Sequence, residues 1–173
     1  MKKLTRDSMA ELRRALDALR APDLSDESLD DALERLAIET TTRAGLKLFC
    51  ATANAPELPP AVTEALHRVA QEAMANVERH AAATTVSLLF DVQPDALVLT
   101  IRDDGRGLPP DAETRPGHYG LRGMRERVEG LGGTLTLSSN GAGTTVVVRV
   151  PVSSRPVISG SVSQQPERRK EAP

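Results

Sequence analysis

The chain has 173 residues, the length of a single domain, and its acidic and basic side chains nearly cancel at a net charge of −2. So small a charge argues against non-specific DNA binding, and the low aromatic content of 2% argues against a base-stacking platform for nucleic acid. One cysteine excludes an internal disulfide and a cysteine zinc cage, and 12 glycines with 12 prolines are too few for a collagen-like or low-complexity chain.

No apolar run in the sequence is long enough to span a membrane. The basic start of the chain is not followed by the apolar stretch of a secretory signal. Together with the single cysteine, this favours a reducing, cytoplasmic location.

The spacing of apolar residues predicts two amphipathic helices at the start of the chain. The first covers residues 4–20 and ends before Pro22, because proline disfavours helix at the residue before it. The second begins after Ser25, a suitable N-cap, and stops near Gly45. Its inward side is a row of four residues at helical spacing: Leu29, Leu33, Leu36 and Thr40.

A short strand over 46–53 leads to a long helix over 61–81. The apolar residues of this helix form one arc on the helical wheel, which marks the side that faces the core. His67 falls on the polar side of the same wheel, so we expect it at the surface. The arc consists of Val62, Leu66, Val69, Ala70, Ala73 and Val77.

Two strands with alternating apolar residues follow, at 86–90 and 97–101, with a turn between them. A glycine- and proline-rich loop over 104–119 leads into a third helix, which ends at Gly132. The core-facing residues of that helix are Leu121, Met124, Val128 and Leu131.

The last element is a hairpin of strands over 134–139 and 144–152, joined through Asn140-Gly141, a dipeptide typical of tight turns. Residues 153–173 are polar and without period, which predicts a disordered tail. Helices that alternate with mostly antiparallel strands predict an α+β fold. We expect a two-layer sandwich with a mixed, mostly antiparallel sheet and helices on one face.

Two segments carry side chains that could bind a metal or a base. Glu72, Asn76 and His80 form one row along the long helix, and a carboxylate with an amide one turn apart can hold Mg²⁺ through oxygen atoms. Asp103 precedes the alternate glycines of IRDDGRGL (101–108), where the backbone can turn sharply and approach a ligand. Taken alone, each is more simply explained as a solvated helix edge and an acidic turn.

A third segment, GHYGLRGM (117–124), runs into a helix whose free N–H groups suit phosphate. Its glycine spacing matches neither the Walker A motif nor the dinucleotide fingerprint. Taken alone, this segment is more simply explained as a flexible loop than as a phosphate site. The arginines that follow could face phosphate, although a solvated helix face is the commoner arrangement; they are Arg122, Arg125 and Arg127.

In this order, the segments resemble the ATP-binding domain of sensor histidine kinases, in the class that pairs with LuxR-type response regulators. The wider family is the GHKL or Bergerat-fold ATPases, with gyrase, chaperone and mismatch-repair members. HRVAQEAMANVERHAAATTV resembles the N box and IRDDGRGL the first glycine box. GHYGLRGMRERVEGLGG resembles the lid with the second glycine box, and NGAGTTVVVRVP the closing hairpin. The resemblance covers roughly residues 24–152 and implies a Bergerat-type fold.

The resemblance implies a role for each matching polar residue. Asn76 would hold the Mg²⁺ that bridges the phosphates of ATP, and Glu72 would orient the metal-bound water or assist proton transfer. Arg79 and His80 stand where relatives contact phosphate or ribose. Asp103 would select adenine by accepting a hydrogen bond from its N6 amine.

The glycines and their neighbours complete the implied nucleotide site. Gly105 and Gly107 would make room for the base, and Thr144 would support Asp103 through its hydroxyl. A mobile ATP lid would use its two glycines as hinge and phosphate contacts. Further nucleotide contacts are thereby implied for Leu108, Gly120, Leu121, Arg122, Gly123 and Met124.

Two features depart from the family pattern. The acceptor helix of such kinases carries a histidine followed by an acid, but His67, His80 and His118 are followed by Arg, Ala and Tyr. We therefore expect the acceptor on a histidine-bearing dimerisation hairpin that is missing here or supplied in trans; residues 1–22 resemble the end of its second helix. Asp104 stands where Asn is common, which would add a negative charge near the base.

The resemblance implies ATP and Mg²⁺ as ligands, a LuxR-type response regulator downstream, and a homodimer in a full-length form, without direct contact to nucleic acid. The chain would be cytoplasmic, or the cytoplasmic part of a membrane-bound sensor. Its organisation would be a helix over 1–22, an ATP-binding domain over 24–152 and a tail over 153–173.

Two other functions stay open. One is an anti-sigma-type serine kinase of the same fold, which needs no histidine hairpin. The other is a nucleotide-binding module that does no chemistry. The missing acceptor suits the serine kinase, whereas LRGMRERVEGLGG and the N-terminal helix favour the sensor kinase.

Overall fold

The computed structural model describes residues 27–109 and 119–152. Several expectations therefore lie outside the described residues: the N-terminal helix, the N-cap at Ser25, most of the 104–119 loop and the tail over 153–173.

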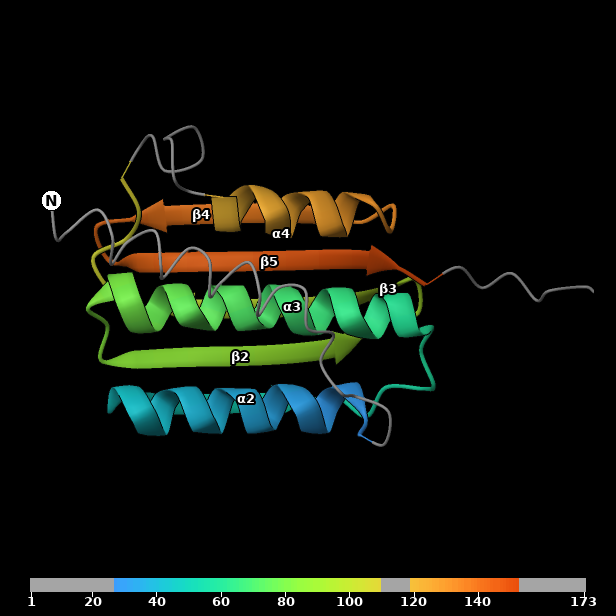
Figure 1. Cartoon of the computed structure of the whole chain (residues 1–173), viewed down its shortest axis with the longest axis horizontal. Helices are drawn as coiled ribbons and strands as arrows, with labels where there is room; N and C mark the ends of the chain where they lie inside the picture. Colours follow the sequence, from blue (N-terminus) through green and yellow to red (C-terminus); the bar gives the residue numbers. More distant parts are fainter. Residues whose placement is uncertain (1–26, 110–118, 153–173) are drawn as a thin grey trace, which may run out of the picture.

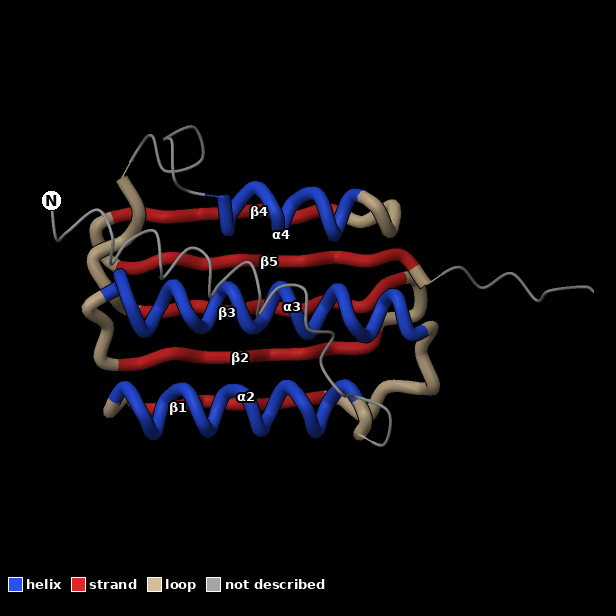
Figure 2. The backbone as a smooth tube through the Cα atoms, viewed as in Figure 1, coloured by secondary structure: helices blue, strands red, loops and turns tan. Residues whose placement is uncertain are grey.

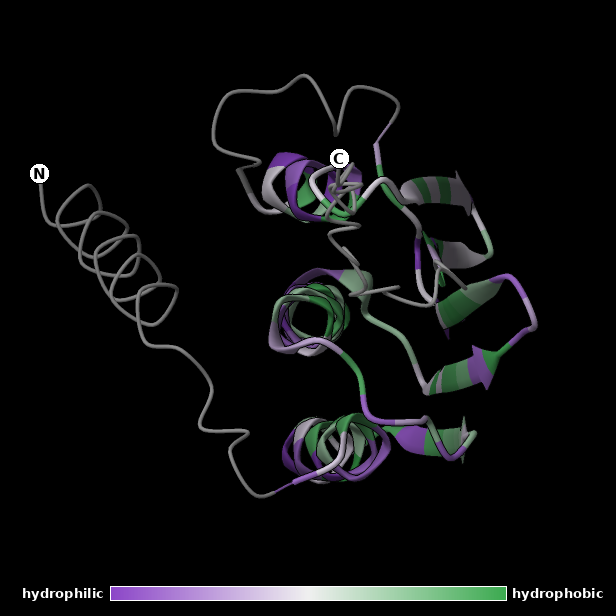
Figure 3. Ribbon diagram, turned by 90° about the vertical axis from the view of Figure 1, so that its right-hand side faces the viewer, coloured by the Kyte–Doolittle hydropathy of each residue, from purple (hydrophilic) through white to green (hydrophobic). Residues whose placement is uncertain are grey.

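The described chain forms two layers, a five-stranded sheet and three α-helices that cover one of its faces (Figures 1 and 3). β1 and β2 run parallel, and the other three neighbouring pairs of strands are antiparallel. The expected α+β sandwich with a mixed, mostly antiparallel sheet is confirmed. Across the sheet the strands are β1 (Lys47–Thr52), β2 (Thr85–Val92), β3 (Ala96–Asp103), β5 (Gly143–Pro151) and β4 (Thr134–Asn140).

The helices lie side by side, with α3 (Pro60–Asn76) between α2 (Leu29–Ala44) and α4 (Tyr119–Glu129) (Figure 2). In the part of the chain that the structure covers, no helix is both long enough and apolar enough to cross a membrane.

The N-cap of helix α2 lies three residues after Ser25, the serine that the sequence suggests. Ser28 is the N-cap, and its Oγ accepts a hydrogen bond from the N–H of Asp31 at 3.3 Å. Both Ser25 and Ser28 are followed by acidic residues, so the sequence alone does not decide which serine is the N-cap. The helix ends as predicted at Gly45, whose φ of 69° is left-handed and whose N–H donates to Thr41.

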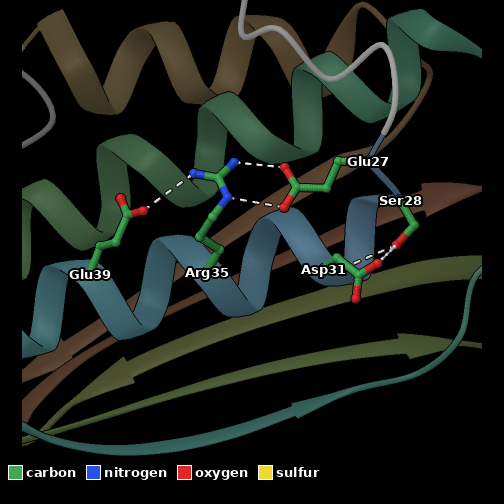
Figure 4. Close-up of polar contacts among 5 residues, drawn as sticks. All are labelled: Glu27, Ser28, Asp31, Arg35 and Glu39. Carbon is green, nitrogen blue, oxygen red and sulfur yellow. Dashed lines mark hydrogen bonds and ion pairs between the residues drawn. The ribbon is translucent and has the colours of Figure 1, made fainter.

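An ion pair connects the residue two positions before α2 to the second turn of the helix. The Arg35 guanidinium donates to both oxygens of Glu27, at 3.0 and 2.7 Å, and reaches Glu39 at 3.5 Å (Figure 4). The hydrogen bonds from Arg35 hold the pKa of Glu27 below its ordinary value. This pair connects Glu27, which precedes the helix, to a side chain within it.

The long helix does not run uninterrupted to residue 81, as the sequence predicts. It continues from α3 into a π-helical turn, η1 (Val77–Ala81), which ends at Ala82 with a left-handed φ of 50°. A π-turn takes in an extra residue, so the four-residue spacing no longer fixes where His80 points. The turn leaves backbone carbonyls near the end of the helix for other partners.

The core lies between the helices and the inner face of the sheet, and α3 supplies its centre. The predicted arc on α3 is buried, except for the half-buried Val62. Met74 is also fully buried, although it lies off the arc, because α3 is covered on both flanks by other helices. Leu88, Leu99 and Val148 are among the sheet residues that are buried in this core.

The expectation that His67 lies at the surface is wrong. Its side chain is only 6% exposed, and its Nδ1 is buried without a hydrogen-bond partner. The helical wheel identifies the side of α3 that faces the sheet, but it cannot reveal that α2 packs against another side. Burial lowers the pKa of His67, the Arg35 and Arg68 cations lower it further, and the Glu27 carboxylate opposes them.

The final hairpin is as tight as predicted but turns at different residues. Asn140 pairs with Gly143, so Gly141 and Ala142 are the two central residues. The Asn140 side chain bridges the turn, because its Oδ1 accepts the N–H of Ala142 at 2.9 Å.

The burial of His67 predicts that acid destabilises the fold. The unfolded chain takes up a proton near pH 6.5, whereas the folded chain takes it up only at lower pH. The free energy of unfolding should therefore fall as the pH drops from 7.5 to 5.5, and less so in His67→Gln. Urea titrations at both pH values measure this.

The surface variant His80→Gln controls for the loss of a histidine as such. The lowered pKa values of Glu27 and Glu78 place their titration below this pH window. An equal drop in stability in the wild type and His67→Gln would contradict the prediction.

Candidate functional site

A pocket opens between the helical layer and the sheet, where α3 and η1 meet α4 and the ends of β3 and β5. The hollow, including its part open to solvent, measures about 450 Å³. Most of its wall is apolar: Ala73, Val77, Ala81, Ile101, Leu108, Leu121, Met124, Leu137 and Val146. Its polar side chains are Asn76, His80, Asp103 and Thr144.

The pocket brings together residues from all four of the motifs. Asn76 and His80 come from the N box, Asp103 and Leu108 from the first glycine box, and Leu121 and Met124 from α4. Thr144 enters from β5. Sequence reasoning had not named the other apolar wall residues as part of a site, although the inward register of Ile101, Leu137 and Val146 on their strands could have placed these three there.

Asp103 is the last residue of β3 and faces the helical layer. It is 5% exposed, and its Oδ1 accepts the backbone N–H of Gly105 at 2.8 Å. Among the described residues its second oxygen, Oδ2, has no hydrogen-bond partner, so it can accept from a ligand. The Thr144 hydroxyl lies 3.4 Å from Ser139 Oγ, and its hydrogen bond to Asp103 stays a prediction.

Two hydrogen bonds connect the first glycine box to the end of the π-turn. The Arg106 N–H donates to the Ala81 carbonyl at 2.8 Å, and the Arg106 Nε donates to the His80 carbonyl at 2.8 Å. Gly105 lies so close that a Cβ there would overlap the Ala81 carbonyl oxygen. The box can approach the helix end only because this residue has no side chain.

Asp104, whose charge the sequence places near the base, is not part of the pocket wall. Its carboxylate accepts the N–H groups of Thr84 and Thr85 at 2.7 and 2.9 Å, and the Thr84 hydroxyl at 2.7 Å. These hydrogen bonds hold the pKa of Asp104 well below its ordinary value. The acid therefore holds the loop before β2, and Asp103 alone of the two faces the pocket.

Gly107 packs against the final hairpin. Its φ of 76° is left-handed, and a Cβ would overlap the Asn140 carbonyl oxygen. The next N–H, that of Leu108, donates to Ser139 Oγ at 2.6 Å. Gly105 and Gly107 are not part of the pocket wall. Their small size lets protein segments approach one another, which places Asp103 and Leu108.

Glu72 and Gly120 lie against each other, which joins α3 to the first turn of α4. A Cβ on Gly120 would overlap the Glu72 carboxylate. Both lie beside the pocket rather than in its wall, while Asn76, one turn on from Glu72, faces into it.

The remaining predicted residues, Arg79, Arg122 and Gly123, are not brought into the pocket wall. Arg79 is exposed on η1. Arg122 is exposed and pairs with Glu126 at 2.7 Å, which raises its pKa. Arg125, which could have faced phosphate, donates to the Leu135 carbonyl at 3.0 Å and so anchors α4 to β4.

Known proteins resemble this chain over most of its length. A family model described as "Histidine kinase-, DNA gyrase B-, and HSP90-like ATPase" matches residues 61–154. The sensor protein VraS of Staphylococcus epidermidis is 32% identical over 161 residues, which are 92% of this chain and 46% of VraS. The signal transduction histidine-protein kinase/phosphatase UhpB of Salmonella typhimurium is 39% identical over 142 residues, 81% of this chain and 28% of UhpB.

Among solved structures, the histidine kinase domain of the blue-light activated histidine kinase EL346 from Erythrobacter litoralis superposes with a TM-score of 0.63 at 29% identity. The match covers 71% of this chain and 60% of that domain. The chain spans between about a quarter and a half of the length of the two curated relatives. The family match extends over more than half of the sequence, and the chain belongs to the histidine kinase-, DNA gyrase B- and HSP90-like ATPases, an ATP-binding family.

Proposed function

We propose that this chain is the ATP-binding catalytic domain of a two-component sensor histidine kinase, which transfers the γ-phosphoryl group of ATP to a histidine on another segment. The observation that carries the proposal is the buried Asp103 carboxylate in an apolar pocket that Asn76 also faces. The similarity to VraS, UhpB and EL346 supports the kinase assignment.

Adenine would occupy the apolar part of the pocket. Asp103 Oδ2 would accept a hydrogen bond from the N6 amine, while Oδ1 stays on the Gly105 N–H. Ile101, Met124 and Val146 supply apolar surface for the ring. A carboxylate can only accept here, so the site would favour a base with an amine at this edge.

The phosphates would extend toward Asn76 and the start of α4. The described residues hold no cluster of three or more His, Cys, Asp or Glu side chains that could cage a metal. The Asn76 amide oxygen, together with phosphate oxygens and water, fits the way proteins hold Mg²⁺. When bound, Mg²⁺ would neutralise charge on the phosphates. Free N–H groups at the start of α4 would add to this.

Glu72 would act beside the phosphates, at its contact with Gly120. Its carboxylate would orient water at the metal or take a proton as the acceptor reacts. Arg79, His80, Arg122 and Gly123 remain proposed phosphate, ribose or lid contacts. Phosphoryl transfer depends mainly on positioning and charge neutralisation.

The acceptor histidine would come from a dimerisation hairpin, of which residues 1–22 would be the end. His67 is buried in the described fold, and none of the three histidines is followed by an acid. We propose an ATP-binding domain over 24–152 and a tail over 153–173. A LuxR-type response regulator would act downstream, and the domain would work in the cytoplasm.

The neighbouring acids Asp103 and Asp104 provide a matched test of the adenine contact. Asp103→Asn replaces an acceptor by a donor toward the N6 amine and should weaken ATP binding at least about tenfold. Asp104→Asn makes the same chemical change outside the pocket and should leave affinity within about threefold. Isothermal titration calorimetry measures both. Equal losses in the two variants would contradict the assignment.

Asn76 should be needed for the contribution of magnesium. Wild-type protein should bind ATP more tightly with Mg²⁺ than with EDTA, and Asn76→Ala should lose that difference. Binding of adenosine, which has no phosphates, should be the same in both proteins. An unchanged magnesium effect in Asn76→Ala would contradict the metal assignment.

The chemistry of the product separates the three candidate functions. With radiolabelled ATP and a histidine-bearing hairpin supplied in trans, we expect label that is lost in acid, as phosphohistidine is. Acid-stable label on a serine of another protein would favour the anti-sigma-type kinase. ATP binding without any transfer would favour a module that does no chemistry.

A further inference from the structure

The face of the sheet that the helices leave open carries a second, polar hollow, at the end of the β4–β5 hairpin. It measures about 380 Å³ including its part open to solvent. Its wall includes Arg102, Ser138, Ser139, Asn140, Gly143 and Thr145. None of these residues belongs to the wall of the nucleotide pocket.

Strand register places three of these side chains in one row. Arg102 of β3 pairs with Thr145 of β5, which pairs with Ser138 of β4. Neighbouring Cβ atoms in such a row lie about 4.5–5.5 Å apart, so one small ligand can reach all three. The row follows from the antiparallel pairing and requires no movement of the backbone.

The alternation of side chains along a strand separates this hollow from the nucleotide pocket. On β3, Asp103 faces the pocket while Arg102 faces the opposite side. On β5, Thr144 and Thr145 divide in the same way. The two hollows therefore share two strands as a wall and open on opposite faces of the sheet.

The charge of the hollow is unbalanced. Arg102 is exposed, and within residues 27–109 and 119–152 its guanidinium makes no ion pair or side-chain hydrogen bond. No acidic side chain lines the hollow. Arg149, another outward-facing arginine, instead donates to Gln93 and Asp95, each at 2.8 Å. The hollow thus holds a cation without the partner that a comparable arginine has.

The other polar groups of the hollow are suited to donate. The hydroxyls of Ser138 and Thr145 can each donate one hydrogen bond. The Asn140 side chain uses Oδ1 to accept the Ala142 N–H, which leaves its NH₂ group to donate. A guanidinium fork with hydroxyl and amide donors around it matches a tetrahedral anion with several acceptor oxygens.

We propose that this hollow binds a phosphate group, held by Arg102 and the donors of Ser138, Asn140 and Thr145. It is a separate site from the one that would hold the phosphates of ATP, and it does not depend on the proposed kinase activity. Because the hollow is open to water, we expect an affinity on the order of millimolar.

The test is an NMR titration of the amide signals with sodium phosphate at constant ionic strength. Signals of Ser138, Gly143 and Thr145 should shift and saturate. Arg102→Ala should weaken this binding about tenfold, whereas Arg149→Ala, a matched arginine on the same face, should leave it within about twofold. Shifts that do not saturate, or equal effects of the two substitutions, would overturn the proposal.

Two further measurements keep the outcome specific. Phosphate that enters the nucleotide pocket moves the signals of Asn76 and Gly120 instead, and those shifts should be unchanged in Arg102→Ala. Thr145→Val removes one donor and keeps the shape of the side chain, so it should weaken phosphate binding without altering ATP binding. Free phosphoserine is compared with inorganic phosphate: tighter binding would assign the hollow to a phosphorylated side chain, and equal binding to the free ion.

Discussion

Two backbone carbonyl oxygens at the end of η1, those of His80 and Ala81, hold the loop that follows β3. Arg106 binds both, through its side chain and its backbone N–H. This contact fixes the distance between the helix that carries Asn76 and the strand that carries Asp103. The pocket lies between these two elements, with α4 beside them.

The glycines of the first box matter for the same contact. Gly105 lets the loop approach Ala81, and Gly107 lets it approach the turn of the final hairpin. Asp104 secures the loop from the other side, through Thr84 and Thr85. The loop after β3 thus consists largely of contacts between protein segments, and these contacts direct one carboxylate, that of Asp103, into the pocket.

Local patterns predicted most of the fold. The apolar arc of α3, the stop of α2 at Gly45 and the alternation in the strands are properties of neighbouring residues, and each was confirmed. What failed depends on partners distant in sequence. His67 is buried because α2 packs against α3, and the π-turn after Asn76 leaves no mark in a helical periodicity.

In the candidate site, too, local motifs could be predicted and contacts between distant segments could not. Asp103, Asn76 and Thr144 could be named from motifs, and the fold brings them to one pocket. The direction of Asp104 and the role of Arg106 could not be named, because both depend on a loop meeting the end of a helix some twenty residues earlier in the chain. The alternation of side chains along β3 predicts the side of the sheet on which Arg102 lies. The hollow that Arg102 faces could not be predicted, because the β4–β5 hairpin forms most of its wall.

The proposed hydrogen bond between Asp103 and the N6 amine of adenine can be tested by comparing nucleotides that differ at this edge of the base. Inosine triphosphate differs from ATP at this edge, where it carries a carbonyl oxygen that would face the carboxylate. Calorimetry with Mg²⁺ should find ATP bound at least about tenfold more tightly than inosine triphosphate. Equal affinities for the two nucleotides would mean that Asp103 does not contact the base, and the placement of the nucleotide in this pocket would be wrong.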